Sequence, residues 1–195
     1  PVGADWTNRD SLLGFENTLS NSYSLPPNNV PKFVERASRE ENRDKPYFLI
    51  LDEMNLSIVE RYFADFLSAM ESSNKEISLH QIERKENEKQ KLPPNKLKLP
   101  PNLFIIGTVN IDESTYMFSP KVLDRANTIE FRLNETDVAA FLHRGAVTLN
   151  LDELVGKGKD MAASFVQNCR IGIHQNLFWL LVFIMIHTFK PLKKA

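Results

Sequence analysis

The sequence is poor in cysteine, in glycine and in net charge. It has one cysteine, seven glycines and a formal net charge of −1 over 195 residues. The lone Cys169 excludes an internal disulfide and a zinc site built from cysteines, and it favours the reducing cytoplasm. The balanced charge excludes a strongly basic module that coats nucleic acid. The first residues carry no basic segment followed by an apolar one, so we predict no signal peptide.

Long hydrophobic runs are also scarce. The longest run extends from Leu177 to Ile186. A membrane-spanning helix needs about 20 apolar residues, so this run is too short to span a bilayer alone. We predict a buried helix here, or a segment that packs against a partner. Contact with a membrane through residues 171–189 is the weaker alternative.

The residues that are present predict an α/β fold. The runs Tyr47–Leu51 and Leu103–Val109 are short, apolar and without alternation, as in parallel strands buried on both faces. Thr128–Phe131 alternates and predicts a third strand. Helical patterns lie between the strands, and they predict a mainly parallel sheet. We expect helices at 11–15, 30–39, 57–72, 120–125 and 135–143. The helix at 57–72 would begin with a capping box of Ser57 and Glu60, and Ser119 would be the N-cap of the helix at 120–125. Residues 76–99 are expected to form a hairpin.

Polar residues stand where two of these strands end. Asp52 and Glu53 follow the first strand, and Asn110 follows the second. Ligands bind at the carboxyl ends of parallel strands, and Mg²⁺ prefers oxygen ligands while keeping several waters. We therefore predict that Asp52 holds Mg²⁺ through water, Glu53 polarises a water for attack on a phosphate, and Asn110 orients that water. Arg125 would offer its guanidinium to the developing phosphoryl charge across a subunit boundary.

Four segments in this order resemble one family, the McrB-type AAA+ NTPases, which are motor subunits of modification-dependent restriction systems. Residues 48–55 (FLILDEMN) resemble their Walker B segment, and residues 102–110 (NLFIIGTVN) resemble their sensor-1 strand. Residues 118–127 (FSPKVLDRAN) are similar to the segment that ends in the arginine finger. Residues 5–15 (DWTNRDSLLGF) are similar to the segment between the phosphate-loop helix and Walker B.

The resemblance implies a three-layer, P-loop NTPase-like core over residues 1–135. Residues 136–195 would form a partial helical lid or an altered C-terminal segment. It also implies Mg²⁺ and ATP or GTP as cofactors, with Asn55 and Asp52 on the nucleotide side of the site. The expected partners are further copies of the chain in a ring of about six, a separate nuclease subunit, and DNA held by domains outside this sequence.

Two features depart from the family. No Gly-x-x-x-x-Gly-Lys-Ser/Thr loop, the usual cradle for nucleotide phosphates, occurs in the chain. In the family that loop precedes a segment like residues 1–15, so we expect a core that is incomplete at its N-terminus and nearly inactive alone. Leu56 stands where the family often has arginine. A non-catalytic scaffold or regulatory subunit, and a MoxR-like chaperone, remain as alternatives.

Overall fold

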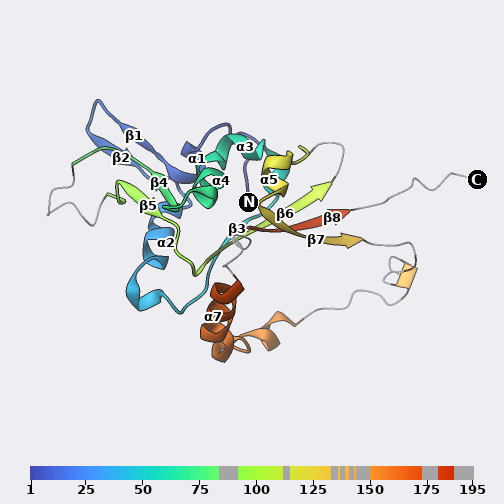
Figure 1. The fold of residues 1–195 in the computed structure, drawn as a ribbon. Coiled ribbons are helices and arrows are strands. Elements are labelled where there is room, and N and C mark those ends of the chain that lie inside the picture. Colours follow the sequence, from blue (N-terminus) through green and yellow to red (C-terminus); the bar gives the residue numbers. More distant parts are fainter. Residues whose placement is uncertain are drawn as a thin grey trace, which may run out of the picture.

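The structure is a computed structural model that describes residues 1–83, 92–111, 115–132, 136, 139–140, 143, 150–172 and 180–186. It is a mixed α/β fold with a small parallel sheet and several short helices (Figure 1). The sheet strands are β3 (Tyr47–Leu51), β6 (Leu103–Ile111), β7 (Ala126–Arg132) and β8 (Leu180–Ile186). They lie in the order β3-β6-β8-β7, and every neighbouring pair is parallel. The predicted fold class is confirmed at this level.

The position of β8 is a correction to the sequence prediction. The described part of the apolar run, residues 180–186, is a strand rather than a buried helix. It lies between β6 and β7 and pairs along its whole length with both. The run is rich in aromatic and β-branched residues, which suit a strand enclosed by neighbours on either side. Its length alone does not distinguish such a strand from a helix.

One face of the sheet is covered by helices and forms the core. Leu49 and Leu51 of β3 and Ile105 and Val109 of β6 are buried on this face. They pack in one cluster with residues of α3 (Val59–Tyr62) and α4 (Ala64–Glu71). Tyr62, Phe66 and Leu67 of these helices are fully buried, and so is Phe63, which lies between α3 and α4. This packing of α3 and α4 holds β3 and β6, the strands that carry the polar residues, in place.

The other face is more open than the sequence predicts. Phe48 and Ile50 of β3 are 45% and 59% exposed, so the prediction of a strand buried on both faces is wrong in this structure. The helix α7 (Ala162–Gly172) lies across the sheet from α3 and α4 (Figure 1). Its Phe165 packs against Phe48 and Phe104, at ring distances of 6.1 and 5.0 Å. Within the described residues, α7 covers only part of this face.

The chain after β3 is broken into short pieces. A turn of 3-10 helix, η2 (Met54–Leu56), precedes α3, and Phe63 interrupts the helix between α3 and α4. The predicted capping box is wrong. Ile58 is the N-cap of α3, the Ser57 hydroxyl donates to the Trp6 carbonyl at 2.7 Å, and Glu60 accepts from the Ser119 amide at 3.2 Å. Both side chains hold distant segments instead of capping a helix.

Several other elements agree with the sequence prediction. The helices α1 (Asp10–Leu13), α2 (Val30–Ala37) and α5 (Pro120–Leu123) form as expected, with η1 (Glu40–Asn42) after α2. Proline lies in the first turn of α2 and of α5, where a missing N–H costs little. Ser119 is the N-cap residue of α5, although its side chain makes no capping bond. The predicted hairpin is β4 (Glu76–Ser78) with β5 (Lys96–Lys98).

A second hairpin lies at residues 15–24, where the sequence predicts no strand and where Phe15 is expected to end a helical turn. It consists of β1 (Phe15–Asn17) and β2 (Ser22–Ser24). Gly14 precedes β1 with φ of 87°, and a Cβ there would lie 2.2 Å from the Ser24 carbonyl oxygen. Only glycine fits this position, because the left-handed backbone and the close carbonyl both exclude a side chain.

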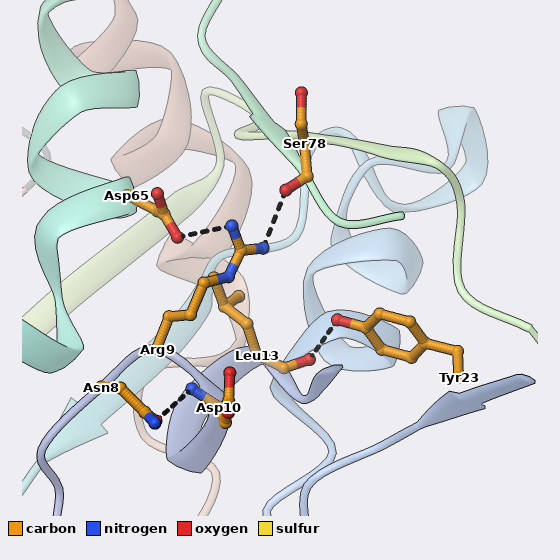
Figure 2. Close-up of polar contacts among 7 residues, drawn as sticks. All are labelled: Asn8, Arg9, Asp10, Leu13, Tyr23, Asp65 and Ser78. Atoms are coloured by element: carbon orange, nitrogen blue, oxygen red, sulfur yellow. Dashed lines mark hydrogen bonds and ion pairs between the residues drawn. The ribbon is translucent and has the colours of Figure 1, made fainter. Parts of the chain in front are cut away.

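Arg9 joins the N-terminal segment to two other parts of the chain (Figure 2). Its guanidinium forms an ion pair with Asp65 of α4 at 2.9 Å and donates to the Ser78 carbonyl of β4 at 2.8 Å. Nearby, the Tyr23 hydroxyl donates to the Leu13 carbonyl at 2.9 Å. These contacts hold the two hairpins and α1 against α4.

Two expectations lie largely outside the described ranges: the charged run 83–91, which we expect to be a solvated loop or hairpin tip and of which only Glu83 is described, and the expected helix at 135–143. The described C-terminal part also contains η4 (Leu151–Leu154) and η5 (Lys159–Met161). Among the described residues, no helix is long and apolar enough to cross a membrane.

Candidate functional site

An acidic turn follows β3 at the carboxyl end of the sheet. Asp52 and Glu53 are both exposed there. Glu53 has φ of 53°, a left-handed conformation that costs a residue with a side chain about 1–2 kcal/mol. The Asp52 carbonyl accepts a hydrogen bond from the Val2 amide at 2.8 Å. The two carboxylates are therefore carried on a tight, tethered turn at the sheet edge.

Thr108 of β6 connects this turn to the neighbouring strand. The parallel register pairs Leu51 with Gly107, so Thr108 lies beside Asp52. The Thr108 hydroxyl donates to Asp52 Oδ1 at 2.7 Å, and the Glu53 amide donates to Thr108 Oγ1 at 2.9 Å. One hydroxyl thus contacts both residues of the acidic pair.

Gly107 allows the turn to approach β6 closely. A Cβ at this position would lie 2.6 Å from Met54 Sδ, well inside contact distance. Met54 is fully buried, and its carbonyl accepts from the Tyr62 hydroxyl at 2.9 Å. The missing side chain at Gly107 therefore lets Met54 anchor η2 under the acidic turn.

The structure brings Asn55 and Asn110 together through the side chain of Asn55 and the backbone of Asn110. The Asn55 side chain is 2% exposed, and its Nδ2 donates to the Asn110 carbonyl at 2.9 Å. The Asn55 carbonyl accepts from the Tyr116 amide, and Thr115 Oγ1 also donates to the Asn110 carbonyl. Asn55 Oδ1 is buried without a partner among the described residues. Asn55 thus joins the turn to the end of β6, while Asn110 lies on the same face of β6 as Thr108.

Arg125 lies apart from the acidic turn. It precedes β7, whose first residue aligns through β8 with Ile105, upstream of Thr108 on β6. Its guanidinium pairs with Glu71 of α4 and donates to the Lys121 carbonyl, and the side chain is 14% exposed. Within one chain the structure does not bring Arg125 to Asp52, Glu53 or Asn110.

The donor set suits one mode of magnesium binding. Among the described residues, no group of three or more His, Cys, Asp or Glu side chains is placed to hold a metal ion. Magnesium does not need such a cage, because it keeps several waters and is bound by one or two carboxylates together with substrate phosphates. The exposed Asp52 carboxylate beside Glu53, with a hydroxyl donor behind it, fits this mode.

Sequence reasoning missed Thr108 and Gly107 as members of the site. Both lie in the segment that resembles sensor 1, but no pattern in the sequence identifies which strand residue faces the acidic turn. The parallel register of β3 and β6 supplies that information.

Comparisons with protein-family models, with curated proteins and with solved structures gave no match. The chemistry of this sheet edge is therefore argued from the residues themselves.

Proposed function

We propose that this chain supplies the magnesium-binding and water-activating part of an NTPase core similar to that of McrB-type AAA+ motors. One observation carries the proposal: the exposed Asp52–Glu53 turn lies at the carboxyl end of parallel strand β3 and is hydrogen-bonded to Thr108 on β6. In open α/β sheets this edge is where ligands bind. Adjacent exposed carboxylates on such an edge suit phosphate chemistry that uses Mg²⁺.

The two carboxylates have different surroundings and would do different work. Asp52 is oriented by Thr108 and would hold Mg²⁺ through water. Glu53 would accept a proton from the attacking water, a role open to a carboxylate within reach of that water. Asn110, at the end of β6, would orient the same water. Bound Mg²⁺ would supply charge that the developing phosphoryl oxygens require.

Arg125 would act on the site of a neighbouring copy in a ring of about six. Inside one chain it is held by Glu71 at the other end of the strands, which suits a residue that does not serve its own site. Ring assembly would require the guanidinium to leave Glu71. Coupling to a separate nuclease, DNA contact through other domains, the use of ATP or GTP and a cytoplasmic location belong to the same proposal.

Paramagnetic broadening tests the cation site directly on the 195-residue chain. Mn²⁺ substitutes for Mg²⁺ and broadens NMR signals of amides near the ion. We expect broadening at the amides of Asp52, Glu53 and Thr108, reversed by excess Mg²⁺. Asp52→Asn should abolish it, and the matched variant Asp44→Asn should not. Broadening spread over surface carboxylates in proportion to exposure would refute the cation site.

The lack of a Gly-Lys-Ser/Thr loop in these residues favours a second candidate, a non-catalytic AAA+-like scaffold or regulatory subunit. The codons upstream of Pro1 discriminate between the two. A phosphate-binding loop within about one strand–helix unit upstream supports the motor, and its absence there supports the scaffold.

A further inference from the structure

We propose that Thr108 is a positioning residue that assigns different roles to Asp52 and Glu53. This inference rests on the proposed function, because it concerns how the same sheet edge prepares its two carboxylates. It adds a residue that has no part in the predicted set of Asp52, Glu53, Asn55, Asn110 and Arg125.

The direction of both hydrogen bonds follows from the atoms involved. A backbone N–H can only donate, so Thr108 Oγ1 accepts from the Glu53 amide at 2.9 Å. A hydroxyl has one hydrogen, and Thr108 places it on Asp52 Oδ1 at 2.7 Å. This short bond to a carboxylate is of the charge-assisted type. The Thr108 hydroxyl therefore accepts from Glu53 and donates to Asp52 at the same time, and the reverse directions are excluded.

The consequences for the two acidic residues differ. Thr108 holds Asp52 by its side chain, so one carboxylate oxygen has a fixed orientation before any cation arrives. It holds Glu53 by the backbone only, in the left-handed conformation at φ of 53°. The contact between Thr108 and Glu53 uses the Glu53 amide and does not involve its carboxylate. Asp52 is thus preorganised as a ligand, whereas the Glu53 carboxylate is not used by Thr108 and can accept the proton of the attacking water.

Donors that orient a ligating carboxylate affect metal affinity without touching the metal. Loss of such an outer partner typically costs 10–100-fold in affinity or activity. Thr108 fits this role in a strand, because its β-branched shape suits β6 and its hydroxyl reaches the neighbouring turn. Valine preserves the shape and removes the hydroxyl, and serine preserves the hydroxyl and removes the methyl group.

The experiment compares Thr108→Val and Thr108→Ser with Thr128→Val, which makes the same change at an exposed position of β7. Mn²⁺ affinity is measured on the 195-residue chain from broadening of the Asp52 amide signal, with Mg²⁺ competition. We expect Thr108→Val to bind about tenfold more weakly, Thr108→Ser within about twofold of wild type, and Thr128→Val unchanged. The Glu53 amide resonance should shift in Thr108→Val alone, because it loses its acceptor.

The outcomes separate this inference from the proposed function. If wild type shows no local broadening at Asp52, the cation site fails and Thr108 has no such role. If wild type binds and Thr108→Val binds equally well, only the role of Thr108 is refuted. If circular dichroism shows that Thr108→Val does not fold, the Mn²⁺ affinity of Thr108→Ala is measured instead, because alanine also lacks the hydroxyl. A tenfold loss in Thr108→Ser, despite its hydroxyl, would also overturn the inference.

Discussion

Asn102 offers a sharp test of how the sheet edge is held. It lies immediately before β6 and is 1% exposed. Its Nδ2 donates to three carbonyls, those of Ala37 at 3.1 Å and of Asn42 and Lys45 at 2.9 Å each. The end of α2, η1 and the connection to β3 therefore meet at one amide. In Asn102→Ala these buried carbonyls lose their donor.

The magnitude follows from the two hydrogens of the amide. Two net hydrogen bonds contribute about 1 kcal/mol each, and leaving buried acceptors without a donor adds about 1 kcal/mol or more. We expect Asn102→Ala to lower the free energy of unfolding by about 3 kcal/mol. Asn102→Asp should cost more at neutral pH, because a carboxylate would face carbonyl oxygens with no hydrogen to donate.

Urea unfolding followed by circular dichroism measures these differences. The matched control is Asn28→Ala, whose exposed side chain donates to the Ser11 carbonyl at 2.8 Å and accepts from the Val30 amide. Water can replace those bonds, so we expect a cost of about 1 kcal/mol or less. Equal costs for Asn102→Ala and Asn28→Ala would refute the reasoning from burial.

Two further predictions concern packing and pH. Gly107→Ala places a Cβ 2.6 Å from Met54 Sδ, and we expect a loss of about 1–3 kcal/mol in urea unfolding, since fully buried Met54 has to move. Burial raises the pKa of Tyr23 from 10.0 to about 12, while Arg9 opposes the shift. The folded state therefore favours the neutral phenol, and its stabilising effect is complete below pH 10 and is lost between pH 10 and 12. Unfolding of wild type and Tyr23→Phe across this pH range should show a steeper loss for wild type; parallel curves would contradict the burial of the phenol.

The sequence predicted the parallel strands because their residues leave few alternatives. Tyr47–Leu51 and Leu103–Val109 are short apolar runs followed by polar residues, and both lie in strands, β3 and β6. Asp52 and Glu53 follow β3 as predicted, whereas Asn110 lies inside β6, one residue before its last residue, Ile111. Local sequence patterns are sufficient to predict an element when residues adjacent in the sequence determine its conformation.

Contacts between distant segments could not be predicted in this way. Ser57 has the spacing of a capping residue, but α3 begins one residue later, with Ile58 as N-cap, and the Ser57 hydroxyl donates to the distant Trp6 carbonyl. The run at 180–186 is compatible with a helix or a strand, and the open position between β6 and β7 decides in favour of the strand. The contact of Thr108 with Asp52 depends on the register between β3 and β6, which the sequence does not specify. Each of these outcomes depends on a partner far away in the chain.

Comparison of Glu53→Gln with Asp52→Asn tests the central claim, the division of labour between the two carboxylates, most directly. Nucleotide binding and hydrolysis would be measured in a form of the protein that includes a phosphate-binding loop. We expect Glu53→Gln to bind ATP or GTP with Mg²⁺ as tightly as wild type and to hydrolyse it at least about 100-fold more slowly. Asp52→Asn should instead weaken the Mg²⁺-dependent part of binding. Loss of binding in Glu53→Gln, or hydrolysis at the wild-type rate, would contradict the claim.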